Sequence, residues 1–173
     1  MGWRGVRLLW GEIRGAVERA WSCKDSEILI DGPAGTGKTT GLLLKALAVL
    51  EKYPGARILL VRKTRASMTE SILVSLEDKI LGPGHPLRGN VQRANRTSYP
   101  HPNGGTIVVG GLDNVDRIMS TDYDLVIVFE ATEITENDFE TLTTRLRNHV
   151  VPYQQIILDC NPSGTRHWII QRA

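Results

Sequence analysis

The sequence has no long apolar run. Roughly 20 consecutive apolar residues are needed to cross a bilayer, and no stretch of the chain approaches that length. The first residues also lack the apolar segment and small-residue cleavage site of a secretory signal peptide. These absences predict a cytoplasmic protein with no membrane partner.

Cysteine is scarce as well. Cys23 and Cys160 are the two cysteines of the chain, and they lie far apart without the spacing of metal ligands. A disulfide framework and a zinc site are therefore not expected, whereas a reducing, intracellular setting is.

The chain has no large excess of charge of either sign. It contains 21 Lys and Arg residues and 19 Asp and Glu residues, so its formal net charge is +2. A net charge this small gives no whole-chain argument for nucleic-acid binding. With 173 residues, 41% of them hydrophobic, it suits one soluble globular domain and is too short for two. We therefore expect a single domain over residues 1–173.

The hydrophobic pattern predicts an α/β fold. Apolar residues recur every three or four positions over residues 3–21, which predicts an N-terminal helix within 1–21, followed by a core over 22–173. In that core, short apolar runs alternate with helical stretches, as in a mostly parallel sheet with helices on both faces. The expected strands cover 27–30, 57–61, 106–109, 124–129 and 155–160, and the expected helices cover 39–53, 66–81 and 136–147.

One segment carries a phosphate-binding motif. Residues 32–39 read GPAGTGKT, which matches G-x-x-x-x-G-K-[ST] between an expected buried strand and a long helix. In this P-loop, backbone N–H groups cradle phosphates, Lys38 reaches the β- and γ-oxygens, and the Thr39 hydroxyl takes a Mg²⁺ position. The predicted ATP-binding residues of the loop are Gly32, Pro33, Ala34, Gly35, Thr36, Gly37, Lys38, Thr39 and Thr40.

A candidate catalytic acid follows the apolar strand 124–129. Glu130 would emerge at the carboxyl edge of the sheet, beside the P-loop, either to orient the attacking water or to hold Mg²⁺ together with Thr39. Glu133 points to the same cleft or caps the next helix near Thr135. Phe129 stands where many such ATPases carry a second acid. Asn161, after the last strand, is expected to sense the γ-phosphate or simply to form a turn.

These segments together resemble the ATPase domain of the large terminase subunit of tailed bacteriophages. The matching stretches lie within residues 25–170: GPAGTGKTT, ILLVRKTRASMTESIL, DRIMSTDYDLVIVFEATEIT, DFETLTTRLR and DCNPSGTRHW. The resemblance implies a RecA-like P-loop ATPase with ATP and Mg²⁺ as cofactors. It implies a motor that packages double-stranded DNA in the infected host cell, with the portal, the small terminase subunit and further copies in a ring as partners.

The resemblance also assigns roles to residues. Lys38 and Thr39 match the Walker A positions, Glu130 the catalytic glutamate, and Asn161 the motif that couples hydrolysis to movement. Arg117 is similar in placement to an arginine finger offered to a neighbouring subunit, with a surface arginine as the alternative. Large terminases also carry a C-terminal nuclease domain, and we expect none within this chain.

Contact with DNA is predicted from local basic clusters on loop edges. They hold phosphates without reading sequence if they face DNA, and are ordinary solvated surface otherwise. The clusters comprise Arg62, Lys63 and Arg65, then Arg88, Arg93 and Arg96. Alternatively, Arg62 points into the ATP pocket. Two other functions stay open: another RecA-like DNA-dependent ATPase or helicase, and a nucleotide-binding remnant of a decayed prophage.

Overall fold

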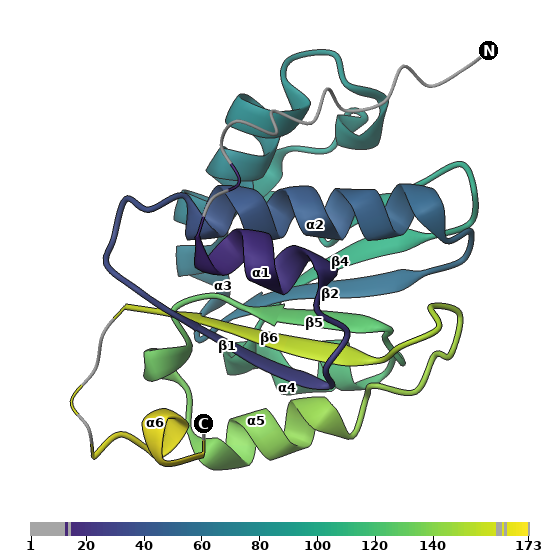
Figure 1. Ribbon diagram of the computed structural model, residues 1–173. Coiled ribbons are helices and arrows are strands. Elements are labelled where there is room, and N and C mark those ends of the chain that lie inside the picture. Colours follow the sequence, from purple (N-terminus) through teal and green to yellow (C-terminus); the bar gives the residue numbers. More distant parts are fainter. Residues whose placement is uncertain (1–12, 14, 162–163, 165, 173) are drawn as a thin grey trace.

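The computed structural model describes Ile13, residues 15–161, Gly164 and residues 166–172, which form a six-stranded sheet with helices on both faces (Figure 1). The strand order is β1-β6-β5-β2-β4-β3, and every pairing is parallel except that of β3 with β4. The strands are β1 (Glu27–Asp31), β2 (Arg57–Arg62), β3 (Ser98–Pro100), β4 (Thr106–Gly111), β5 (Leu125–Val128) and β6 (Gln155–Cys160). The predicted mostly parallel sheet is confirmed.

Helices cover both faces of this sheet. Figure 1 shows α1 and α2 over one face and α4 and α5 over the other. The helices are α1 (Ala16–Ser22), α2 (Lys38–Lys52), α3 (Arg65–Ser67), α4 (Val115–Met119), α5 (Glu136–Thr143) and α6 (Trp168–Arg172). Two π-helical turns follow α3, namely η2 (Met68–Ile72) and η3 (Ser75–Leu81). Short 3-10 turns cover Pro86–Arg88, Arg93–Asn95, Leu112–Asn114 and Ala131–Glu133.

Alternate residues of the central strands feed two separate cores. Ile58 and Leu60 of β2 lie in the core under α2, whereas Leu59 and Val61 lie in the core under α4 and α5. All four β5 residues are buried. A parallel strand between two helical layers must be apolar on both sides, which is why β5 reads as an unbroken apolar run.

Several expected elements differ from the structure. The strand at 27–30 is not buried throughout: β1 lies at the sheet edge, and Glu27 and Asp31 are exposed. The helix expected over 136–147 ends at Thr143, because the Tyr123 N–H bonds the Arg145 carbonyl at 2.7 Å and draws the following segment to the sheet. Strand β3 and helix α4 are too short to have been predicted.

The N-terminal helix prediction is only partly covered. Helix α1 accounts for Ala16–Ser22, and the expected residues 1–12 and 14 lie outside the described residues. The helix expected over 66–81 is present, but most of it is wound as the wider π turns η2 and η3. Within the described ranges, no helix has the length and apolarity needed to span a membrane.

One of the two predicted basic clusters does not form a free basic surface. Arg93 and Arg96 form ion pairs with the buried Glu77 at 2.9 and 2.8 Å, and Arg88 lies 3.7 Å from the same carboxylate. The Tyr99 hydroxyl donates a hydrogen bond of 2.8 Å to Glu77 as well. These arginines hold the segment after η3 against β3, so the prediction that they contact DNA loses its basis.

A buried carboxylate joins the loop before β6 to the sheet. Asp124 is fully buried and accepts hydrogen bonds from the backbone N–H groups of Arg57 and Val151, at 3.0 Å each, and from the side chains of Asn148 and Gln154. Burial alone would raise the pKa of Asp124, but these donors outweigh burial, so its pKa lies below the ordinary value. The charged form is therefore the one that stabilises the fold.

Asp124→Asn should lower the free energy of unfolding by about 3 kcal/mol at neutral pH, because several buried donors lose a charged acceptor. The folded pKa is depressed, so this contribution is present above the unfolded pKa and is lost as the pH falls through the folded pKa. Urea denaturation of the two proteins should therefore converge under acid. The control Asp122→Asn removes an exposed pairing with Arg147 and should cost less than about 1 kcal/mol. Equal losses in the two variants would contradict the assignment.

Candidate functional site

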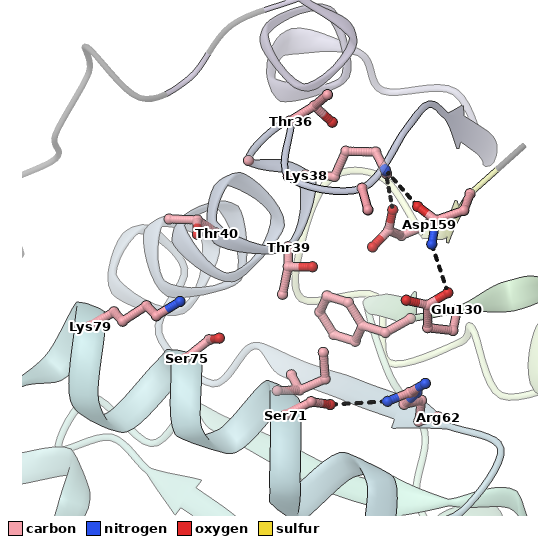
Figure 2. Close-up of a pocket in the computed structure, with 16 residues that line it drawn as sticks. Thr36, Lys38, Thr39, Thr40, Arg62, Ser71, Ser75, Lys79, Glu130 and Asp159 are labelled. Carbon is pink, nitrogen blue, oxygen red and sulfur yellow. Dashed lines mark hydrogen bonds and ion pairs between the residues drawn. The ribbon is translucent and has the colours of Figure 1, made fainter.

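A pocket of about 400 Å³ opens where β1, β2, β5 and β6 end. Figure 2 shows its side chains converging from the loop before α2, from strand ends on one side and from the π turns on the other. The lining residues are Ala34, Gly35, Thr36, Gly37, Lys38, Thr39, Thr40, Arg62, Ser71, Ile72, Ser75, Lys79, Phe129, Glu130, Asp159 and Asn161. Predicted site residues from three segments far apart in the sequence thus meet in one cavity.

The loop between β1 and α2 has the conformation that its glycines allow. Gly35 and Gly37 have φ angles of +80° and +78°, where any residue with a Cβ would be strained. Helix α2 begins at Lys38, immediately after Gly37, so its unpaired N–H groups and positive dipole end face the pocket. This arrangement suits a phosphate group.

Lys38 is buried at the base of the loop. Its Nζ donates hydrogen bonds to the carbonyl oxygens of Gly32 and Pro33, at 2.6 and 3.0 Å, and to Asn161 Oδ1 at 3.4 Å. Gly32 and Pro33, predicted to bind nucleotide, therefore lie behind the loop and anchor the lysine, whereas residues 34–40 line the pocket itself. The ammonium group is held by the backbone at the place where negative charge would arrive.

Glu130 follows β5 in a conformation that is rare for a residue with a side chain. Its φ and ψ angles are both 51°, in the left-handed region, which costs about 1–3 kcal/mol. The resulting bend brings its Oε2 to 3.4 Å from Asn161 Nδ2. Lys38, Asn161 and Glu130 therefore form one hydrogen-bonded chain across the pocket, which the separate sequence motifs could not show.

The sequence did not point to every pocket residue: Asp159 was missed, as were Ser71, Ile72, Ser75 and Lys79. Asp159 is only 6% exposed, its Oδ1 lies 3.9 Å from Lys38 Nζ, and that oxygen has no hydrogen-bond partner in the described part of the chain. Burial raises the pKa of Asp159 to about 6. Lys38 opposes this rise, Glu130 adds to it, and a hydrogen bond with Thr39 opposes it. The position of Asp159 two residues before Asn161 was the available signal, because such residues share one face of a strand.

The opposite wall carries Arg62, which settles its two predicted positions in favour of the pocket. Its guanidinium donates hydrogen bonds to Ser71 Oγ at 3.0 Å and to Glu133 Oε1 at 3.2 Å. Glu133 is exposed, does not line the pocket and does not cap α5, since Thr135 and Asp138 form that cap. Lys63, the next residue of the basic cluster, is paired with Asp138.

The site offers oxygen donors for a divalent cation. Thr39 and Glu130, the predicted Mg²⁺ ligands, both line the pocket, and Asp159 adds a carboxylate oxygen without a partner among the described residues. Hydroxyl and carboxylate oxygens are what Mg²⁺ prefers. No group of three His, Cys, Asp or Glu side chains in the described residues is arranged to hold a metal by itself. A cation would therefore need phosphate or water oxygens as well, as Mg²⁺ commonly does.

Arg117, the predicted arginine finger, does not enter this pocket. It is exposed on α4 and lies near Arg65, whose pKa is lowered chiefly by burial, with a smaller effect from Arg117. In a single chain it therefore does not line the site.

The sequence and the fold match known proteins. The sequence model of the phage terminase large subunit family matches residues 24–173. The large terminase of a thermophilic bacteriophage superposes with a TM-score of 0.69 at 14% identity, over 93% of this chain and 41% of that one. Its complex with ADP gives 0.67 at 17%, over 96% and 40%. The ATPase domain of the Thermus phage P74-26 large terminase gives 0.62 at 17%, over 94% and 72%.

These similarities confirm the predicted RecA-like P-loop fold. This chain spans 41% of the length of the thermophilic-phage terminase, so it corresponds to part of that protein. A comparison with curated protein sequences gives no significant match.

Proposed function

Because the chain belongs to the phage terminase large subunit family, we propose that it is an ATP-hydrolysing motor domain that drives packaging of double-stranded viral DNA. The thermophilic-phage large terminase, which shares the fold, has been solved with ADP and with ATP-γ-S. The family match gives no support to the alternatives of a helicase or a decayed remnant. ATP is therefore the nucleotide assigned to the pocket.

The observation that carries this proposal is the chain from Lys38 through Asn161 to Glu130. The Lys38 ammonium group, which neutralises the terminal phosphates, is linked by the Asn161 amide to the Glu130 carboxylate, which is placed to orient the attacking water. The Lys38 end of this chain responds to the γ-phosphate, because the arrival of the phosphate draws the ammonium group toward it and its loss releases Lys38. Asn161 thus reports the nucleotide state to the segment that follows β6.

The cation chemistry fits the same residues. Thr39 and Glu130 would hold Mg²⁺, which supplies charge neutralisation at the phosphates when bound. Arg62 and Lys79 add positive charge on the wall opposite the loop. The pocket therefore offers cations to the phosphates from two sides and carboxylates to the water and metal.

Calorimetric titration with ADP and Mg²⁺, together with phosphate release from ATP, tests the proposal. We expect binding and slow hydrolysis by the isolated chain, with faster hydrolysis on addition of double-stranded DNA. A folded sample that binds no nucleotide would refute the proposal. The remaining partners that we propose are the portal, the small terminase subunit and further copies in a ring, in the cytoplasm of the infected host cell.

Arg117 acts in this proposal on the pocket of a neighbouring copy. Hydrolysis per chain should then rise with protein concentration, and Arg117→Ala should lower the rate of the assembled form by about 1,000-fold or more. ADP binding to the single chain should not change, because Arg117 lies outside the pocket. Arg57→Ala, at the start of β2 and also exposed, is the matched control. A rate that is independent of concentration in the wild-type protein would contradict a role in trans.

A further inference from the structure

The strand end after β5 carries a phenylalanine where an acid would face the P-loop helix. Phe129 is fully buried and belongs to the core under α2, so its side chain offers no ligand to a cation. It lines the pocket all the same. The first position after β5 is therefore without a charge.

The neighbouring strand places a carboxylate beside it. Strands β5 and β6 are parallel, with Ile127 opposite Ile157 and Val128 opposite Leu158. Continued by one residue, this register sets Phe129 beside Asp159. Register partners of parallel strands project to the same face, so both side chains face the P-loop. Ile127, Phe129 and Ile157 lie in the one core under α2, which agrees with that orientation.

One oxygen of Asp159 is not used by the described part of the protein. A buried carboxylate normally has its oxygens satisfied, yet Oδ1 has no hydrogen-bond partner among the described residues. Its distance of 3.9 Å to Lys38 Nζ exceeds hydrogen-bond length, and Lys38 bonds backbone carbonyls instead. Leaving such an oxygen unpaired is costly, so a cation at this point would stabilise it.

We propose that Asp159 is a metal-ligating residue of the ATP site, where it supplies, from β6, the carboxylate that Phe129, the residue after β5, does not. It would act beside Thr39 and Glu130, directly or through a water, on the Mg²⁺ that accompanies the nucleotide. The inference rests on the proposed function.

The test is the dependence of ADP affinity on Mg²⁺. ADP binding is measured by calorimetry with Mg²⁺ and with EDTA. The dissociation constant in EDTA divided by that in Mg²⁺ reports how much the metal strengthens ADP binding. Asp159→Asn keeps the shape and removes the charge, and should lower this ratio by about 10- to 100-fold. The same variant should bind less Mn²⁺ in the presence of ADP, which electron paramagnetic resonance measures.

Two further variants make the result specific. Asp31→Asn, at the same sheet edge but paired in register with Cys160, removes an exposed carboxylate and should leave the ratio unchanged. Adding Phe129→Asp to Asp159→Asn returns a carboxylate to β5 and should restore part of the ratio. If the substitutions prevent folding, the wild-type protein with ¹³C-labelled aspartate decides, since Mg²⁺ added to its ADP complex should shift the Asp159 carboxyl resonance and not that of Asp124.

The outcomes separate this inference from the proposed function. An unchanged ratio in Asp159→Asn, or an Asp159 resonance that does not respond to Mg²⁺, overturns the role of Asp159 while ATP binding stands. A wild-type protein that binds ADP under neither condition refutes the proposed function itself.

Discussion

Replacing Lys38 with alanine is expected to lower kcat/KM for ATP hydrolysis by about 100- to 1,000-fold, as removal of one preorganised donor to developing negative charge does. The ammonium group is fixed by Gly32 and Pro33 at the centre of the phosphate-binding loop and is linked to Asn161. Alanine removes the charge and the link together. Phosphate release measures the loss of hydrolysis, and ADP calorimetry measures the loss of nucleotide affinity separately.

The control for this variant lies on the same helix. Lys52→Ala removes an exposed ammonium group from the last turn of α2, far from the loop. It should hydrolyse ATP at the parent rate, which shows that the loss in Lys38→Ala is a property of the site and not of charge on α2. Undiminished hydrolysis by Lys38→Ala would remove the basis of the site assignment.

Glu130→Gln should separate binding from hydrolysis. The amide keeps the size of the side chain and an oxygen to accept from Asn161 Nδ2, so ADP affinity measured in EDTA, without Mg²⁺, should change little. It does not serve as a base, so the single-turnover rate of hydrolysis should fall by about 100- to 10,000-fold. Quenched-flow measurement of one turnover gives the rate directly, because product release does not contribute to it.

Glu133→Gln distinguishes the two acids after β5. Glu133 lies outside the pocket and pairs with Arg62, so its amide variant should hydrolyse ATP within a few-fold of the parent rate. Should Glu133→Gln lose turnover while Glu130→Gln keeps it, Glu133 would be the acid that orients the water.

Much of the fold was predictable because its signals are local. The five expected strands and the long helix after the P-loop are present, since an apolar run between two helical layers leaves a record in consecutive residues. The winding of residues 68–72 and 75–81 as π turns left no such record. These turns place Ser71, Ser75 and Lys79, four residues apart, along the pocket wall. The periodicity of the segment fits an ordinary helix equally well.

Charged residues were the least predictable part. Arg96 reads in the sequence as one member of a basic loop, yet it is 4% exposed and bound to the buried Glu77. Arg62 reads as part of a second cluster, and the structure directs it into the pocket. The charged partners of these arginines lie far away in the sequence: Glu77 is 16 residues from Arg93, and Glu133 is 71 residues from Arg62. The packing of other elements decides where such a partner lies.

The amino-acid sequence by itself determined the phosphate-binding loop, because eight consecutive residues contain everything needed for the backbone to wrap around an anion. It also determined that an acid and an amide end two apolar strands. Only the tertiary structure decided that Glu130, Asn161 and Lys38 touch, and that Asp159 lies beside Phe129. Those proximities depend on strand order and register, which are set by the burial of both sheet faces at once and not by any one segment.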